Sequence, residues 1–169
     1  DYGLETLEKV IRKAGFQIVS SNYDFSKTSL KDLIKPFIII KKGGVRIGVI
    51  GINVQPKGLI SSENYKGMKF NDPIKTANNM ASLLRTKHRC DIIVCLSHLG
   101  YISDLNLAES TKGIDIIIGG HTHTFLKEPA IIKNIENKDV NIIQTNGRGI
   151  YIGRLDIDLE KVKKKKNVQ

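Results

Sequence analysis

The sequence contains no tryptophan, and only five tyrosines and five phenylalanines occur among its 169 residues. Proteins that bind single-stranded nucleic acids stack bases on aromatic side chains set within a basic groove. No basic stretch of this chain is interleaved with aromatic residues in that way. We therefore expect no nucleic-acid partner.

Long apolar runs are also missing. No run approaches the roughly 18 residues that a membrane span requires, so we expect no membrane-spanning segment. The chain has no basic-then-apolar leader followed by a small-residue cleavage site, and we expect no signal peptide in it. It opens on Asp1-Tyr2-Gly3 and could equally be a processed or truncated product.

Acidic residues are scarce: the chain has 17 aspartates and glutamates against 27 lysines and arginines, which leaves a net charge of +10. Part of the excess lies in a basic tail over 161–169, and the rest is scattered. This pattern favours a solvated, lysine-rich surface. A polyanion-binding or membrane-surface function is the alternative, and a steep salt dependence of binding would identify it.

Cysteine is nearly absent, with only Cys90 and Cys95. They lie five positions apart in one expected strand and its leading edge, and an odd offset places them on opposite faces. They therefore cannot pair with each other. We expect two buried thiols, which leave the redox compartment open.

The order of expected elements indicates a mixed α/β fold. Helical periodicity from Leu4 to Ala14 predicts a first helix, Gly43-Gly44 predicts a hairpin turn, and Asp72-Pro73 predicts the start of a second helix. A short helix capped by Ser103 is expected between two buried strands. The expected strands cover 17–20, 37–42, 45–52, 92–96, 114–118, 130–133, 140–145 and 150–158.

The histidines are the most informative residues. His98 follows the strand expected at 92–96, and His121 and His123 follow the strand at 114–118 through Gly119-Gly120. The carboxyl ends of buried strands are where α/β proteins place their ligand sites. A short helical crossover joins these strands, so we expect their ends to lie one or two spacings of ~5 Å apart.

Imidazole is a common ligand for zinc, copper, iron and nickel. His121 and His123, two positions apart in an extended loop, can face two different ions, and the glycine pair lets the backbone approach them. Each ring needs a partner for its second nitrogen, which the backbone around Ser97 and Thr122 can supply. The pattern therefore predicts a metal site, whereas His88 suits a structural or solvated place at a helix end.

Two motifs carry a family resemblance. Ser97-His98-Leu99-Gly100-Tyr101 with Asp104, followed by the run from Gly113 to Thr124, resembles the second half of the bacterial 5′-nucleotidase family of calcineurin-like metallophosphoesterases. Asp1-Tyr2-Gly3-Leu4 and Gly153-Arg154-Leu155-Asp156 are similar to the flanks of that half. The resemblance implies a two-sheet β-sandwich flanked by helices, with only its C-terminal part present over 1–160.

The resemblance also implies a function. It predicts metal-dependent hydrolysis of nucleotide phosphomonoesters, of the 5′-nucleotidase or 2′,3′-cyclic phosphodiesterase type, by two divalent ions such as zinc or manganese. His98 and His121 would bind one ion and His123 the other, with Asp104 and Thr122 supporting them. A periplasmic or cell-surface location is expected on the same ground.

The family's remaining groups have no counterpart in this sequence. These are an Asp-x-His, a bridging aspartate and an Asn-His pair whose histidine stabilises the transition state. They are expected upstream of Asp1, and a separate nucleotide-binding domain is also expected outside the chain. The catalytic residues of this chain are therefore unknown, and alone it is expected to bind one ion weakly and to hydrolyse nothing.

The alternative is a degenerate, non-catalytic metal-binding module of the same fold. An Asp-x-His in the upstream coding sequence would favour the enzyme over this module. Weaker candidates have structural interpretations: Asn22 and Asn146-Gly147-Arg148-Gly149 suit turns better than substrate contacts, and Asp91 and Asp115 suit the starts of buried strands.

Overall fold

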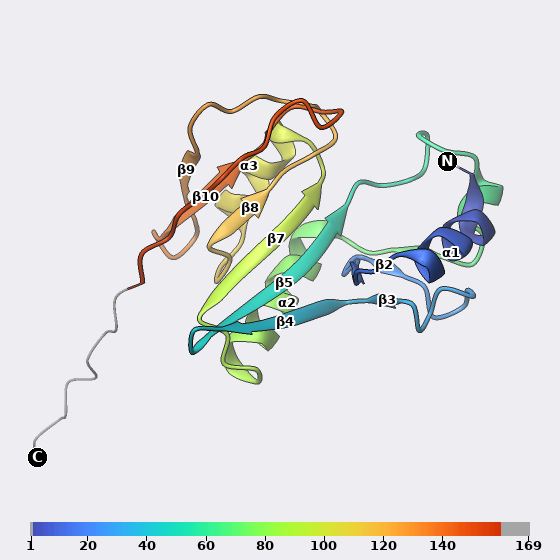
Figure 1. Ribbon diagram of the computed structural model, residues 1–169, viewed down its shortest axis with the longest axis horizontal. Helices are drawn as coiled ribbons and strands as arrows, with labels where there is room; N and C mark the ends of the chain where they lie inside the picture. Colours follow the sequence, from blue (N-terminus) through green and yellow to red (C-terminus); the bar gives the residue numbers. More distant parts are fainter. Residues whose placement is uncertain (1, 160–169) are drawn as a thin grey trace, which may run out of the picture.

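The computed structural model of the protein describes residues 2–159 (Figure 1). Its helices are α1 (Gly3–Lys13), α2 (Pro73–Thr86) and α3 (Tyr101–Ser110), with a 3₁₀ turn η1 (Ser62–Tyr65). Its strands are β1 (Ile18–Val19), β2 (Tyr23–Asp24), β3 (Ile34–Lys35), β4 (Phe37–Lys42), β5 (Val45–Asn53), β6 (Lys69–Phe70), β7 (Ile92–His98), β8 (Ile116–Ile118), β9 (Ala130–Lys133) and β10 (Asp139–Ile143). The mixed α/β class is confirmed.

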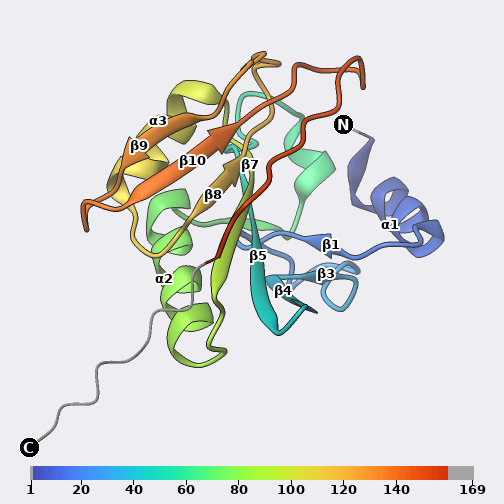
Figure 2. The ribbon, with the colours of Figure 1, turned by 60° about the vertical axis from the view of Figure 1, so that its left-hand side comes forward.

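One six-stranded sheet forms the centre of the molecule. Its order is β4-β5-β7-β8-β10-β9, in which β5, β7, β8 and β10 are parallel and the two edge strands are antiparallel. The crossovers through α2 and α3 place both helices on the same face, as Figures 1 and 2 show. None of the helices in residues 2–159 is long and apolar enough to cross a membrane.

The core lies between this sheet and its two helices. Ile93, Cys95 and Ile117 are fully buried on the helix-facing side, and α2 and α3 contribute small and branched apolar residues to the same cluster. Asp72 caps α2 by accepting a hydrogen bond from the Lys75 N–H at 2.7 Å, with Pro73 at the first helical position. This expected helix start is therefore confirmed, and the small residues of α2 let it pack closely on the strands.

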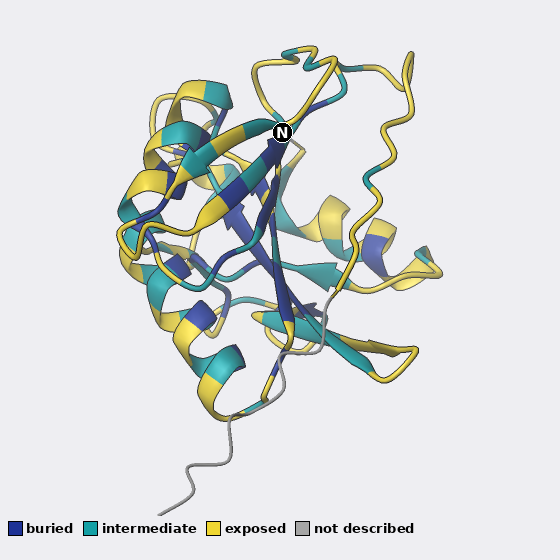
Figure 3. Cartoon of the chain, turned by 90° about the vertical axis from the view of Figure 1, so that its left-hand side faces the viewer, coloured by how far each residue is buried: buried dark blue, intermediate teal, exposed yellow. Residues whose placement is uncertain are grey.

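The opposite side of the sheet, here termed the open face, carries exposed apolar residues. Leu96 of β7 is in register with Ile118 of β8, and the two side chains are 42% and 40% exposed. Ile40 of β4 shares this face and is 46% exposed. Figure 3 shows buried residues gathered along the central strands, whereas the segment after β10 is exposed nearly throughout. Within residues 2–159 the sheet has helices on one side only.

A smaller unit flanks the sheet beside β5. It contains α1, the ribbons β1-β3 and β2-β6, and its own core of Ile11, Phe25, Leu30 and Ile34. The chain leaving β1 crosses the open face at Gly51, where the N–H of Ser21 donates to the Gly51 carbonyl at 2.7 Å. The described residues thus form one large sheet and two ribbons.

Three expectations about the elements are corrected. Ser103 does not cap α3, because the helix begins at Tyr101 after Gly100, whose φ of 95° only glycine adopts easily. The strand expected at 114–118 begins at Ile116. The stretch 150–158 forms no strand, since an isolated strand needs a neighbour for its backbone groups and the described residues pair none with it.

Other expectations agree with the structure or lie outside it. The hairpin turns at Gly43 and Gly44 with φ of 59° and 80°, as a two-residue turn of this kind requires. Cys90 and Cys95 are both free and buried as expected, but they do not lie on opposite faces: both belong to the core cluster under the helices, because Cys90 lies before β7 rather than in it. The basic tail over 161–169 and Asp1 lie outside the described residues, so the domain bounds remain a prediction.

We expect Gly51→Ala to destabilise the protein by about 1–3 kcal/mol, because an added methyl group overpacks the crossing at β1. A Cβ at Gly51 would lie 2.4 Å from the carbonyl oxygen of Val19. Gly15→Ala is the matched control, since a Cβ there meets nothing within 4 Å. Urea unfolding of both variants measures the effect, and equal stabilities would contradict the packing account.

Candidate metal centre

His98 and His121 lie side by side at one edge of the large sheet. His98 is the last residue of β7, and His121 follows the neighbouring parallel strand β8 after two glycines. Their ring centroids are 5.1 Å apart, with an angle of 65° between the ring planes. The sequence-based expectation that the two strand ends are neighbours is therefore confirmed.

The loop after β8 has an unusual backbone. His121 and His123 have φ angles of 70° and 53°, in the left-handed region that costs a non-glycine residue roughly 1–2 kcal/mol. The Thr122 N–H donates to the Gly120 carbonyl at 2.9 Å, which tightens the turn between them. A Cβ at Gly120 would lie 3.0 Å from Nδ1 of His98, so this glycine lets the backbone pass close to the ring.

His123 lies against a second turn, formed by Asn146 and Gly147. A Cβ at Gly147 would come within 2.8 Å of Cγ of His123, so only glycine leaves room for the ring. Asn146 has a φ of 63°, and its side-chain oxygen accepts a hydrogen bond from the Gly147 N–H at 2.7 Å. The turn chemistry expected for this stretch is present, and it also shapes the packing around His123.

The environment of His98 favours its neutral form. Partial burial lowers the pKa of this imidazole, and repulsion from positive charge on His121 and His123 lowers it further. The neutral ring is the form that binds a metal. His98 is thus held in its ligand form, and His123 is near enough to act on it electrostatically.

The donor chemistry of His98 and His121 suits one divalent ion. Two imidazole nitrogens bound to one zinc ion at ~2.0–2.1 Å lie a few ångströms apart, which rings 5.1 Å apart at their centroids can satisfy after small rotations. Nowhere in residues 2–159 do three or more His, Cys, Asp or Glu side chains gather closely enough to hold a metal. The assignment of His98 and His121 to one ion and of His123 to a second ion therefore stays a prediction.

Asp104 and Thr122 lie close to the histidines, and their hydrogen bonds fix the backbone around them. Ser97 donates a hydrogen bond from its hydroxyl to the Asp104 carboxylate, and the same hydroxyl accepts from the Leu99 N–H at 3.2 Å. Thr122 accepts from the Tyr101 N–H at 3.1 Å and lies 2.9 Å, oxygen to oxygen, from the Thr124 hydroxyl. These contacts fix the residues after β7 relative to the loop after β8.

Asp104 is fully buried, and its Oδ2 is a buried atom without a hydrogen-bond partner. That oxygen packs against Gly119, where a Cβ would come within 2.5 Å of it. Burial raises the pKa of Asp104 to about 6, against the lowering effect of the Ser97 hydrogen bond. Gly119 thus makes room for a carboxyl group that the site keeps away from water.

One residue of this neighbourhood escaped the sequence reasoning. Gln144 follows β10, is 2% exposed, and donates from Nε2 to the Gly120 carbonyl at 2.9 Å. Its signal in the sequence was a polar residue directly after the apolar pair Ile142-Ile143. Sequence reasoning assigned Gln144 only to the strand expected at 140–145.

The weaker candidates have structural contacts. Asn22 is fully buried and exchanges two hydrogen bonds with the backbone of Asn53, at 2.7 and 2.8 Å. Asp91 accepts from the Arg46 N–H at 2.7 Å, and Asp115 pairs with Arg85 at 2.5 Å. The ring of His88 lies 5.0 Å from that of Phe37, centroid to centroid. The structural interpretation of Asp91, Asp115 and His88 agrees with these contacts, whereas Asn22 bridges to β5 instead of forming the expected turn.

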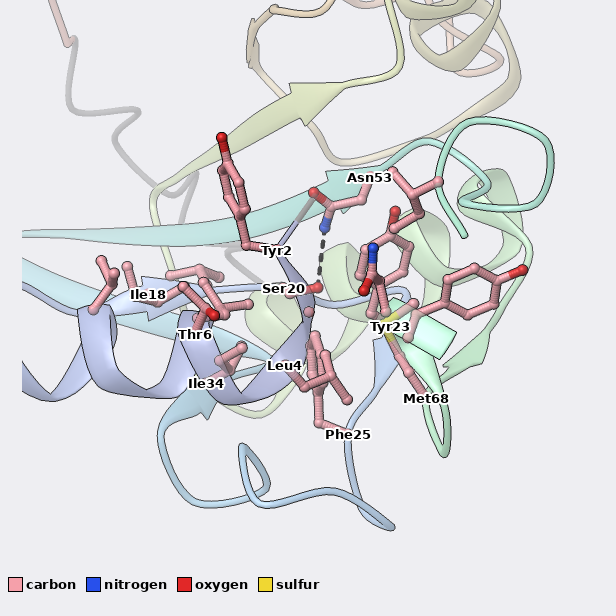
Figure 4. A pocket seen from close by; sticks show the side chains of 17 residues that line it. Tyr2, Leu4, Thr6, Ile18, Ser20, Tyr23, Phe25, Ile34, Asn53 and Met68 are labelled. Atoms are coloured by element: carbon pink, nitrogen blue, oxygen red, sulfur yellow. Dashed lines mark hydrogen bonds between the residues drawn. The ribbon is translucent and has the colours of Figure 1, made fainter. Parts of the chain in front are cut away.

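A hollow of about 370 Å³ lies between α1 and the rest of the small unit, and none of the histidines lines it (Figure 4). Its walls are mainly apolar, and Leu4, Ile18 and Phe25 line it. Asn53 stands at its edge and donates to the Ser20 hydroxyl at 3.0 Å. Asn53 is also the register partner of His98, so the hollow borders the same end of the sheet.

We expect ionisation of the buried Asp104 carboxyl group to make the free energy of unfolding depend on pH. Its pKa rises from about 3.9 in an unfolded chain to about 6 here, so between these pH values the native state binds more protons. The free energy of unfolding then falls as pH rises through this window, by at most about 3 kcal/mol, and stays low above it. Asp104→Asn cannot ionise, so its stability relative to the wild type should rise across the same window. Urea unfolding from about pH 4 to pH 7 measures the difference, and parallel curves for the two proteins would contradict the buried-carboxyl account.

Comparison with known proteins finds relatives that are nucleotide phosphoesterases and 5′-nucleotidases. The chain is 32% identical over 159 residues to the trifunctional nucleotide phosphoesterase YfkN of Bacillus subtilis, covering 84% of this chain and 11% of that protein. A 5′-nucleotidase precursor from Thermus thermophilus matches 82% of the chain with 36% identity and a TM-score of 0.74, over 29% of its own length. The structure of calcineurin-like phosphoesterase YfkN from B. subtilis matches 86% of the chain with 26% identity and a TM-score of 0.69, over 51% of its length.

The chain spans about a tenth to a third of the length of the curated relatives it matches. No family-level sequence profile matches it. The sequence identity and the structural match agree with the histidine motifs and with the α/β sheet that carries them. The chain therefore belongs to the 5′-nucleotidase family of calcineurin-like metallophosphoesterases, which are hydrolases.

Proposed function

We propose that this chain supplies the three-histidine side of a two-metal site that hydrolyses nucleotide phosphomonoesters. The observation that carries the proposal is the placement of His98 beside His121 at the ends of two parallel strands. The functions of the relatives, nucleotide phosphoesterase and 5′-nucleotidase, support the substrate class. Cyclic 2′,3′-phosphodiesters and other phosphomonoesters belong to the same proposal.

Each histidine has a proposed place. His98 and His121 would hold one divalent ion, zinc or manganese, and the lowered pKa of His98 favours the neutral ring that binds a metal. His123, held over Gly147, would hold the other. When bound, a pair of divalent ions lowers the pKa of a coordinated water and stabilises the charge that develops on the transferred phosphoryl group. The chain's own task is to hold these rings at fixed positions.

We further propose that a second polypeptide segment completes the domain. Residues 2–159 offer no cluster of three metal-binding side chains, and in this proposal the bridging carboxylate and the transition-state histidine belong to the second segment. The open face supports this proposal, because Leu96 and Ile118 leave apolar area exposed beside the histidine end of the sheet. Apolar patches of this kind mark interaction sites.

The stretch 150–159 supports the same proposal. Its Leu155, Ile157 and Leu159 alternate with Arg154, Asp156 and Asp158, a period of two that is typical of a half-buried strand. It forms no strand within the described residues. A segment that adds a sheet over the open face would supply its pairing partner. We also propose a periplasmic or cell-surface location and a separate nucleotide-binding domain for the whole protein.

We expect the 169-residue chain to bind one Mn²⁺ weakly, and His98→Ala and His121→Ala each to lower the affinity by at least about tenfold, because each removes one of two ligands to the same ion. His88→Ala is the matched control, since this histidine packs against Phe37. Isothermal titration calorimetry measures the affinities. Equal affinities in all four proteins would contradict the assignment of the site.

We expect the chain alone to release no phosphate from a nucleoside monophosphate in the presence of Mn²⁺, because three imidazoles without a bridging carboxylate cannot hold two ions firmly. Phosphate release is the measurement. Release above the blank would show that these residues suffice, and the proposed second segment would then be unnecessary. A longer polypeptide that includes an upstream Asp-x-His and Asn-His pair is expected to be active.

A further inference from the structure

Gln144 is a buried amide beside the histidine loop. It is 2% exposed and follows β10, the strand that pairs with β8 in parallel. A buried polar side chain is costly unless its hydrogen bonds are made. Its partners therefore show what its position stabilises.

Gln144 and its neighbour hold both ends of the loop that carries His121 and His123. At the start, the Gly119 N–H donates to the Ile143 carbonyl at 2.8 Å, and Nε2 of Gln144 donates to the Gly120 carbonyl at 2.9 Å. At the other end, the Leu126 N–H donates to the backbone carbonyl of Gln144 at 3.0 Å. The two left-handed histidines lie between these attachment points.

The amide also reaches the middle of the loop. The hydroxyl of Thr122, which separates the two histidines, lies 3.5 Å from both the nitrogen and the oxygen of the Gln144 amide. Thr122 in turn accepts from the Tyr101 N–H at the start of α3. One side chain thus connects β10 to the loop and, through Thr122, to the helix that follows His98.

We infer that Gln144 is a positioning residue that sets the spacing of His121 and His123 toward metal ions. Backbone in the left-handed region persists only where surrounding contacts hold it, and the Gln144 amide supplies the central contact to this loop. The inference rests on the proposed function, since it assigns Gln144 to the same metal site. It adds a residue that follows β10, whereas the histidines belong to the ends of β7 and β8.

The chemistry of the side chain explains why an amide is needed. A glutamate of the same length cannot donate to the Gly120 carbonyl when ionised. It would also place a second carboxylate near the buried Asp104. A Cβ added at Gly119 would lie 2.5 Å from Asp104 Oδ2 and 3.5 Å from Gln144 Oε1, so the two side chains flank the same glycine. A methionine of similar volume fills the space but makes no hydrogen bond to the loop.

The test compares Gln144→Met and Gln144→Glu with Val140→Ala in the 169-residue chain. Val140 is fully buried on β10, the strand that Gln144 follows, and its truncation leaves the loop contacts in place while lowering stability. Co²⁺ is the probe, titrated by absorbance, and NMR couplings report the φ angles at His121 and His123. Urea unfolding gives the stability of each variant.

We expect both Gln144 variants to bind Co²⁺ about 10- to 100-fold more weakly than the wild type, as the loss of supporting contacts to metal ligands typically does. Their φ angles at His121 and His123 should leave the left-handed region. Val140→Ala should lose stability but keep the wild-type affinity and φ angles.

Two results overturn the inference and are distinguishable. If the wild type binds Co²⁺ and the Gln144 variants bind it equally well, or no more weakly than Val140→Ala at matched stability, Gln144 has no positioning role. If the wild type binds no Co²⁺, the proposed metal site fails, and the inference about its geometry fails with it.

Discussion

The parallel pairing of β7 with β8 is the constraint on which the candidate site depends. It places Leu96 opposite Ile118 and brings the ends of both strands to one edge of the sheet. His98 is the last residue of β7 and His121 comes two glycines after β8, so their rings lie 5.1 Å apart without any long-range loop having to close. A one-residue change of register would turn the side chain of His98 to the other face.

The support behind these histidines consists of buried polar groups. Asp104 and Gln144 lose water on folding, and Asp104 recovers only part of that loss through hydrogen bonds, since its Oδ2 has no partner. Stability alone would favour apolar residues at such positions. Their presence around a loop with two left-handed histidines indicates that the fold gives up stability for a fixed geometry at this edge of the sheet.

Much of this arrangement was predictable from the sequence, because it follows from local patterns. The glycine pair at Gly43 and the Asp72-Pro73 cap are local signals, and the apolar runs before His98 and His121 gave the two parallel strands. The contacts of Gln144 were not predictable, because they depend on β10 inserting beside β8. The failure at 150–158 has a related cause: a strand pattern shows which faces a segment can bury, but its pairing requires a neighbour that the described residues do not provide.

The central claim is that His98 and His121 share one divalent ion. Paramagnetic broadening by substoichiometric Mn²⁺ in NMR spectra of the histidine rings tests it directly, because the broadening falls off steeply with distance from the bound ion. The account predicts that the ring signals of His98 and His121 broaden together at the lowest Mn²⁺ ratios, while those of His88 stay sharp. Broadening of His88 at the same ratios, or of only one of the paired rings, would contradict it.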